Sequence, residues 1–143
     1  MNAYAAAMNI QVEVKQTGRS TAEGQARTHT VLIDRPLEKG GDDRGMMGGE
    51  YLLVALGGCF MSNLLAAIQA READVQGVRL QISGTLGHAP SRFTDIEVLV
   101  STQASDQQAQ DRELLEKLIV IADRACISSN TLRPAVNLTF RAV

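Results

Sequence analysis

The sequence has no tryptophan, and its aromatic content is only 3%. Aromatic rings are the usual platforms on which nucleic-acid bases stack, so their scarcity argues against a protein built for that purpose. Basic residues are not in excess either, with 14 Lys and Arg against 16 Asp and Glu and a formal net charge of −2. Because no basic run concentrates positive charge, a nucleic-acid binder is not expected.

Cysteine and histidine are also scarce, at two residues each. Two cysteines are too few for the disulfide framework of a secreted protein, and with His29 and His88 they form no zinc-binding spacing. The first residues carry neither a basic segment nor a long apolar core, so we expect no signal peptide and a location in the reducing cytoplasm. There, Cys59 and Cys126 are either inert core residues or redox-active thiols.

The length of 143 residues predicts one domain that spans residues 1–143. Five segments carry the alternating or β-branched pattern that is typical of strands: residues 10–14, 28–34, 78–82, 96–100 and 136–140. We expect the first two to pair as a hairpin and the third and fourth to form a second antiparallel pair. The last segment predicts a final strand.

Residues 50–71 are almost wholly apolar. A run of this length can span a membrane, but Gly57 and Gly58 interrupt it and amphipathic strands flank it, so we expect a buried helix and no membrane association. In a domain this small, a second subunit is expected to cover part of the helix. A second helix carries apolar residues at helical spacing from Leu115 to Cys126. Because strands precede the helices in groups, the expected fold class is α+β.

The two cysteines differ in their expected surroundings. Cys59 follows two glycines, which let another backbone or a small ligand approach its sulfur. It is either buried and inert, with a raised pKa, or activated by a neighbouring cation. Cys126 lies near the C-terminal end of its helix, where the helix dipole disfavours a thiolate. As a redox pair, Cys59 would attack and Cys126 would resolve, although packing alone also explains Cys126.

Glu50 opens the apolar helix, where the helix dipole favours a carboxylate whatever its function. Alternatively, its carboxylate binds an arginine and orients the guanidinium toward Cys59. In a straight helix, Glu50 and Cys59 lie on opposite faces and roughly 13 Å apart along the axis. The arginine would then come from elsewhere, or Glu50 would serve a site shared with another subunit. The candidate arginines precede the helix: Arg19, Arg27, Arg35 and Arg44.

Three segments carry a recognisable pattern: Ile33-Asp34-Arg35-Pro36 with the glycines that follow, Glu50 to Gly57-Gly58-Cys59, and Ala125-Cys126 with Ser129-Asn130-Thr131-Leu132. In order and spacing they resemble the OsmC/Ohr family of osmotically inducible and organic hydroperoxide resistance proteins, and its broader OsmC-like branch in particular. The resemblance covers residues 8–141. It implies antiparallel strands around a long buried central helix, a second helix, and an intertwined homodimer with the central helices in contact.

The resemblance also implies a thiol-dependent peroxidase that reduces organic hydroperoxides in the oxidative stress response. Cys59 would attack and become a sulfenic acid, and Cys126 would then close a disulfide. An external dithiol, such as a lipoyl protein, would reopen it. Glu50 matches the family glutamate that holds the activating arginine, and Arg19 best matches that arginine, with Arg35 as its rival. No metal or organic cofactor is implied.

Two residues depart from the family pattern. Relatives usually carry proline where this chain has Gly49, just before the glutamate, and where it has Ile127, just after the second cysteine. Both changes are expected to loosen the backbone that positions the site. The alternative hypothesis is a non-catalytic dimeric OsmC-like module whose cleft binds a small apolar ligand or a partner protein. A Cys59 pKa near or above about 8.5, the unperturbed value, would favour it.

Overall fold

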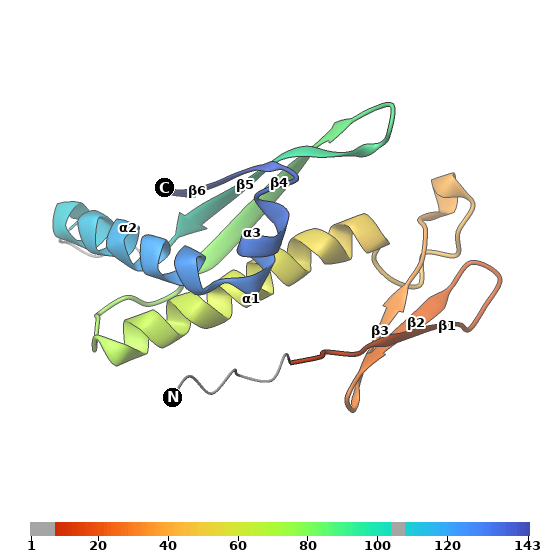
Figure 1. The fold of residues 1–143 in the computed structure, drawn as a ribbon, viewed down its shortest axis with the longest axis horizontal. Coiled ribbons are helices and arrows are strands. Elements are labelled where there is room, and N and C mark those ends of the chain that lie inside the picture. The colour runs from red at the N-terminus through yellow and green to blue at the C-terminus, as the bar shows by residue number, and fades with distance from the viewer. Residues whose placement is uncertain (1–7, 104–107) are drawn as a thin grey trace, which may run out of the picture. The chain divides into compact units, whose positions relative to one another are not determined.

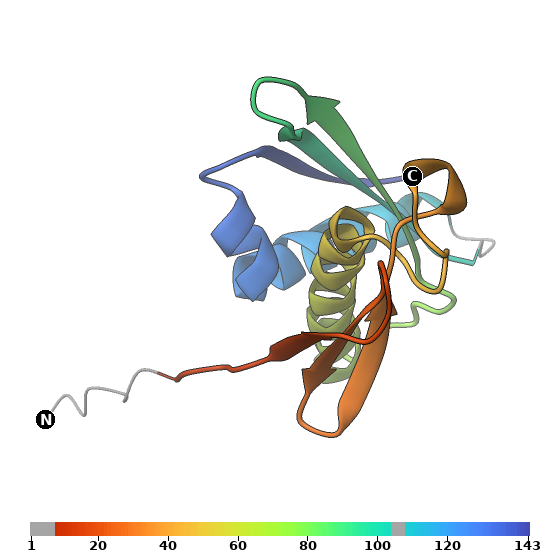
Figure 2. The ribbon, with the colours of Figure 1, turned by 90° about the vertical axis from the view of Figure 1, so that its right-hand side faces the viewer.

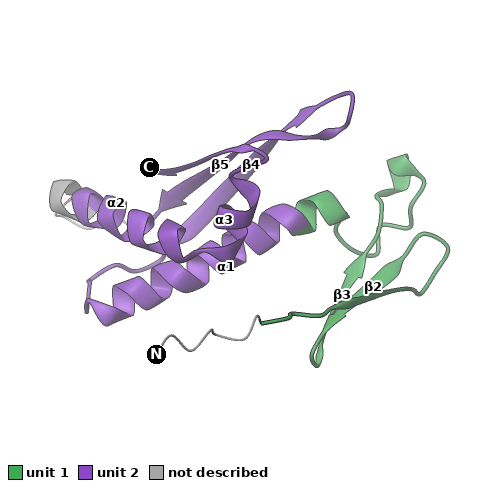
Figure 3. Ribbon diagram, viewed as in Figure 1, with its two compact units in different colours: residues 1–51 green, residues 52–143 purple. Residues whose placement is uncertain are grey.

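The computed structural model describes residues 8–103 and 108–143. Residues 1–7, where we expect no signal peptide, lie outside the described part of the chain. The chain divides into two compact units, residues 1–51 and 52–143 (Figure 3). That residues 1–143 act as one domain stays a prediction. Mixed helices and antiparallel strands confirm the α+β class.

The first unit contains a three-stranded antiparallel sheet in the order β1 (Glu13–Gln16), β2 (Ala22–Ala26), β3 (His29–Ile33) (Figure 1). The expected hairpin between residues 10–14 and 28–34 is wrong, because β2 lies between these segments and pairs with both. The sequence AEGQA of β2 lacks the β-branched and aromatic residues that mark a strand. In the tight turn from β2 to β3, Arg27 takes the positive φ of 56° that such turns require.

A buried carboxylate organises the loop after β3, which includes the short helix η1 (Leu37–Lys39). Asp34 is 2% exposed. It accepts hydrogen bonds from the Thr21 hydroxyl at 2.9 Å and from the N–H groups of Arg35 at 2.7 Å and Arg44 at 3.2 Å. Burial alone would raise the pKa of Asp34, but these hydrogen bonds hold it well below its usual range. The loop therefore folds around a charged group.

The second unit combines three strands with the helices. Helix α1 (Gly48–Ala70) begins in the last residues of the first unit and continues through the second unit. The other elements of the second unit are β4 (Arg79–Gly87), β5 (Arg92–Ser101), α2 (Gln108–Ala125), α3 (Ile127–Leu132) and β6 (Asn137–Ala142). The sheet order is β4-β5-β6, with β4 antiparallel and β6 parallel to β5. This confirms the second antiparallel pair and the final strand. The parallel pairing arises because α2 and α3 carry the chain back across the sheet.

Helices α1 and α2 cover one face of this sheet (Figures 1 and 2). The fully buried core comes from alternate residues of β5 and from one side of each helix: Leu56, Phe60, Leu64, Ile96, Val98, Val100, Leu118 and Ala122. Phe60 also packs on Phe140 of β6 with ring centroids 4.4 Å apart. A Cβ at position 57 would collide with the side chain of Ile82, so Gly57 allows α1 to approach β4 closely.

Helix α1 is buried on one side only. Val54 and Leu65 are 51% and 50% exposed, so the single chain leaves part of the apolar surface of the helix uncovered, as expected if a second subunit covers it. The helix is long and apolar enough to cross a membrane by length and composition. Its inner face nevertheless packs on the core of the second unit, with Leu56 and Phe60 fully buried, as in the core helix of a soluble protein.

Candidate active site

The two cysteines meet in the second unit. Cys59 lies on α1, and Cys126 lies between α2 and α3. Both are free thiols, and the Cys126 thiol donates to the sulfur of Cys59 across an Sγ–Sγ distance of 3.3 Å. Cys126 is fully buried, whereas Cys59 is partly exposed. Since the sulfurs of a disulfide are about 2.05 Å apart, a small movement would bring them into bonding distance.

Cys126 occupies the junction where α2 ends and α3 begins. Its backbone is extended, with φ −81° and ψ 114°, and its sulfur accepts the N–H of Ser129 at 3.5 Å. Cys126 is thus the N-cap residue of α3. The sequence predicts Cys126 within the last turn of the second helix; in the structure it is the residue directly after α2, which ends at Ala125. Helix α3 itself was not predicted, because a six-residue helix is too short to show a hydrophobic period.

The surroundings of Cys59 favour the ionised form of its thiol. Burial alone would raise the pKa of its thiol, but hydrogen bonds outweigh that cost and lower the pKa below its ordinary value. The Cys126 thiol donates to this sulfur at 3.3 Å, and the neighbouring Ser128 and Ile127 lower the pKa as well. A thiolate only accepts hydrogen bonds, so a group of donors favours the charged form. Cys59 is therefore the more nucleophilic sulfur.

Cys126 is shifted in the opposite direction. Burial raises the pKa of its thiol, and although Ser129 donates to the sulfur, the adjacent Cys59 raises the pKa further through its hydrogen bond and its charge. Of the two thiols, Cys59 therefore loses its proton first. This order agrees with the one expected from the sequence, but the dominant cause is burial and the neighbouring sulfur.

Glu50 lies in the first turn of α1. Its carboxylate Oε1 accepts the N–H of Met47 at 2.9 Å, so Glu50 satisfies a free N–H at the start of its own helix. This is the structural role that the sequence position favours.

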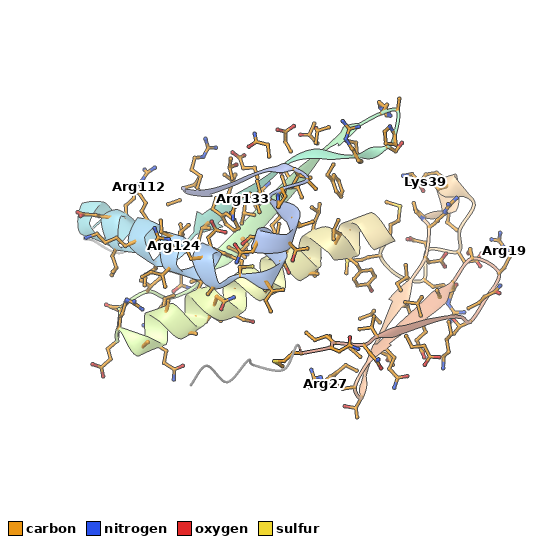
Figure 4. The ribbon with its side chains drawn as sticks, in the orientation of Figure 1. Arg19, Arg27, Lys39, Arg112, Arg124 and Arg133 are labelled. Carbon is orange, nitrogen blue, oxygen red and sulfur yellow. The ribbon has the colours of Figure 1, made fainter. Side chains whose placement is uncertain are left out.

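Arg19 lies in the first unit, on the loop that follows β1 (Figure 4). Its guanidinium donates to the Asp42 carboxylate at 2.7 Å and to the Gly40 carbonyl at 3.1 Å. Arg19 thus pairs with Asp42, while the partner of Glu50 is a backbone N–H. The rival Arg35 is exposed, and its backbone N–H donates to Asp34. Among the predicted site residues, Cys59 and Cys126 are the two that the structure brings into contact.

Sequence reasoning missed the residues that surround the sulfur pair. The Ser129 N–H donates to the Cys126 sulfur, and Ile127 and Ser128 contribute to the lowered pKa of Cys59. A usable signal existed, because a run of small polar residues after a cysteine is typical of a capped turn. Within residues 8–103 and 108–143, no three His, Cys, Asp or Glu side chains gather into a metal-binding group.

Known proteins share both the sequence pattern and the fold of this chain. Residues 40–141 match the family model described as OsmC-like protein. Among curated proteins no sequence match was found.

Solved structures share the whole fold at low sequence identity. An OsmC-like protein of unknown function from Vibrio cholerae is 13% identical, with 96% of this chain and 100% of that chain covered and a TM-score of 0.77. A hypothetical protein from Aquifex aeolicus is 15% identical, with 96% and 98% covered and a TM-score of 0.76. An organic hydroperoxide resistance protein OsmC from Legionella pneumophila is 15% identical, with 96% and 98% covered and a TM-score of 0.68.

Proposed function

The chain belongs to the OsmC-like protein family, and from that premise we propose that it is a thiol-dependent peroxidase that reduces organic hydroperoxides. One observation carries the proposal: a Cys59 sulfur with a lowered pKa lies 3.3 Å from a buried Cys126 thiol with a raised pKa. The family includes proteins named for organic hydroperoxide resistance, as in the similar structure from Legionella pneumophila. That name supports the substrate class.

The first step consumes the peroxide. The Cys59 thiolate attacks one oxygen of the O–O bond, a sulfur–oxygen bond forms and the O–O bond breaks. The leaving alkoxide takes up one proton and departs as an alcohol, while the sulfur is oxidised to a sulfenic acid. Partial exposure of Cys59 gives the peroxide access to this sulfur.

The second step uses Cys126. Its sulfur displaces the hydroxyl of the sulfenic acid, which leaves as water with the proton of the Cys126 thiol, and a disulfide forms. An external dithiol, such as a lipoyl protein, then exchanges with the disulfide, restores both thiols and becomes oxidised itself. Cys126 suits this order because it is buried and its pKa is raised, so the peroxide reacts with Cys59 first.

Two further residues belong to the proposal through the family resemblance. Glu50 and Arg19 are assigned the roles of a carboxylate and a guanidinium that assist the ionisation of Cys59. Glu50 accepts the Met47 N–H, and Arg19 donates to Asp42 and to the Gly40 carbonyl; these contacts lie at the protein surface, where substrate binding can exchange them at modest cost.

We also propose that the protein acts in the cytoplasm as a homodimer in which the outer face of α1 meets a second copy. Val54 and Leu65 leave that face half exposed although it is apolar. Burial of such a face releases ordered water and stabilises a dimer. Light scattering at micromolar concentration should give the dimer mass, and a monomer mass alone would refute this part.

Peroxide-dependent oxidation of the cysteines tests the function. The reduced protein is mixed with cumene hydroperoxide, and the state of Cys59 is followed by mass spectrometry. We expect a Cys59–Cys126 disulfide in the wild type, a trapped Cys59 sulfenic acid in Cys126→Ser, and no peroxide consumption in Cys59→Ser. Equal peroxide consumption by wild type and Cys59→Ser would contradict the proposal.

A further inference from the structure

An ion pair joins the two ends of the segment that carries Cys126. Cys126 lies at the corner where α2 ends and α3 begins. Asp123 is in the last turn of α2, and Arg133 is the residue directly after α3, so the two flank the corner (Figure 4). One guanidinium nitrogen of Arg133 donates to both carboxylate oxygens of Asp123 at 2.7 Å. The pair therefore fastens α2 to the far end of α3.

This pair differs from the other ion pairs of residues 8–103 and 108–143. Its side chains are 25% exposed at Asp123 and 42% at Arg133, which makes it the least exposed pair in the described part of the chain. Water and salt therefore screen it less than a pair on an open surface. The helix dipole disfavours a carboxylate in the last turn of a helix. The Arg133 guanidinium thus stabilises a charge that this end of α2 would otherwise disfavour.

The backbone of Asp123 is bonded to the same corner. Its carbonyl accepts the N–H of Cys126 at 3.1 Å and the hydroxyl of the fully buried Ser129 at 3.1 Å. The Asn130 amide also donates to the carbonyl of Arg124 at 3.1 Å. Each of these bonds connects α2 with the corner or with α3. The position of the Cys126 sulfur therefore depends on how firmly the two helices are joined.

We propose that Asp123 and Arg133 are positioning residues that hold the Cys126 sulfur beside Cys59 and so favour closure of the disulfide. The inference rests on the proposed peroxidase function and deepens it, because it assigns the efficiency of the second step to an ion pair outside the sulfur pair. The sulfurs are 3.3 Å apart as free thiols and must approach to about 2.05 Å. A group that is held close to its target reacts faster than one that must first be brought there.

The first step of the cycle should depend less on the ion pair. Cys59 belongs to α1, whose inner face packs on the core, and it is partly exposed to an incoming peroxide. The second step needs the corner, because the Cys126 sulfur attacks the Cys59 sulfur while the S–O bond breaks. If the corner is loose, the sulfenic acid lasts longer. A second hydroperoxide can then oxidise it to a sulfinic acid and leave as an alcohol.

The test measures how readily the two thiols close without any peroxide. Full-length protein is equilibrated with oxidised and reduced glutathione, and the Cys59–Cys126 disulfide is quantified by mass spectrometry after alkylation. The two protein thiols lose two electrons and two protons, and oxidised glutathione takes them up as two thiols. Since a partly exposed ion pair contributes a factor of up to about five, Asp123→Asn should need about two to five times more oxidised glutathione at fixed reduced glutathione.

Matched variants separate this role from a general loosening of the fold. Arg133→Gln should shift the glutathione midpoint as Asp123→Asn does, and because the two charges act as one pair, the double variant should shift no further than a single one. Arg133→Lys keeps a cation and should lie closer to the wild type than Arg133→Gln. Glu116→Gln breaks an exposed pair with Arg112 on the same helix and should leave the midpoint unchanged. Circular dichroism checks that each variant folds.

The same variants distinguish the two steps when peroxide is present. After one equivalent of cumene hydroperoxide, loss of the Cys59 thiol reports the first step and appearance of the disulfide reports the second. Asp123→Asn should slow the second step about two- to fivefold and the first step less. With excess hydroperoxide, Asp123→Asn should also give more Cys59 sulfinic acid than Glu116→Gln does.

An unchanged glutathione midpoint in folded Asp123→Asn or Arg133→Gln, or shifts that add in the double variant, would overturn the inference. Because glutathione replaces the peroxide, this outcome is independent of the proposed function. A wild-type protein that still reduces cumene hydroperoxide would then retain the peroxidase proposal and lose only the positioning role. Conversely, a shifted midpoint in a protein that consumes no peroxide would contradict the peroxidase proposal and retain the role of the pair in closing the disulfide.

Discussion

The two sheets of this protein are stabilised by different interactions. In the second unit, Ile96, Val98 and Val100 of β5 are buried under α1 and α2. In the first unit, apolar Val14 and Val31 are 62% and 46% exposed, and its fully buried side chains include the polar pair Thr21 and Asp34. In the second unit, burial of apolar side chains under the helices is therefore the main stabilising contribution to the sheet. A sheet without an apolar core depends on hydrogen bonds to a buried charge and on whatever covers its faces.

The largest expected effect is the loss of core packing on α1. Leu64 is fully buried, and the next residue, Leu65, is 50% exposed on the other face. We expect Leu64→Ala to lower the free energy of unfolding by about 2–5 kcal/mol at every protein concentration. Leu65→Ala, on the proposed dimer face, should lower it by less than about 1 kcal/mol at dilutions where the chain is monomeric. Urea unfolding of both variants under monomeric conditions measures the difference, and equal losses there would mean that Leu65 packs within the single chain.

The next effect concerns the first unit and should be smaller. Asp34→Asn removes the charge that gathers the donors of Thr21, Arg35 and Arg44. We expect faster amide hydrogen exchange in residues 34–46, while the amides of β5 keep their protection. The same acceleration in β5 would contradict the view that each unit is stabilised by its own interactions.

The pH dependence of this effect follows from the lowered pKa of Asp34. The stabilisation is complete above the pKa of an unfolded aspartate, about 3.9, and is lost as pH falls toward the lower pKa of the folded state. The difference between wild type and Asp34→Asn should therefore be constant near neutral pH and shrink below about pH 4. Hydrogen exchange or urea unfolding across pH 2–7 measures it.

A third comparison asks whether the first unit takes part in the chemistry. Arg19 pairs with Asp42 at the surface, so Arg19→Gln should change the free energy of unfolding by less than about 1 kcal/mol. If the proposed role holds, peroxide-dependent oxidation of Cys59 slows severalfold. Arg27→Gln, at another arginine of the first unit, is the matched control and should keep the wild-type rate. Unchanged oxidation in Arg19→Gln would limit the chemistry to the second unit.

The smallest effects should come from surface ion pairs, which both units contain. Lys117 and Glu113 pair along α2 at 3.2 Å, and Lys15 and Glu23 pair across β1 and β2 at 3.4 Å. Replacing either lysine by glutamine should lower the free energy of unfolding by about 0.5 kcal/mol or less. The loss should vanish in 1 M salt. A loss that persists in high salt would show that the lysine contributes through packing instead.

The same contrast explains how far the sequence could predict the molecule. Helix α2 and strands β4, β5 and β6 follow from hydrophobic periodicity, and helix α1 follows from a nearly continuous apolar run. Strand β2 and helix α3 could not be predicted in this way. Strand β2 lacks strand-forming residues, and helix α3 is too short to show a period. Elements that lack strand-forming residues or sufficient length leave little trace in the sequence.

The candidate site shows the same limit. The motif around Cys59 and Cys126 predicted a pair of thiols, and helix position predicted which would ionise. The 3.3 Å contact depends on packing between two helices, and the bond from the Ser129 N–H to the Cys126 sulfur depends on a cap geometry. Neither has a periodic signature, so neither could be predicted from the residues alone.

The place of Cys126 on the path between two parallel strands has a further consequence. A bond to Cys59 would tie α1 to the connection that sets the register of β5 with β6, and it would enclose the entire β4–β5 hairpin in a covalent ring. Such a ring restricts the unfolded chain far more than the folded one. In the proposed cycle, the protein would alternate between a disulfide form that resists unfolding more strongly and a dithiol form that resists it less. Resistance to unfolding would then report the oxidation state of the two cysteines.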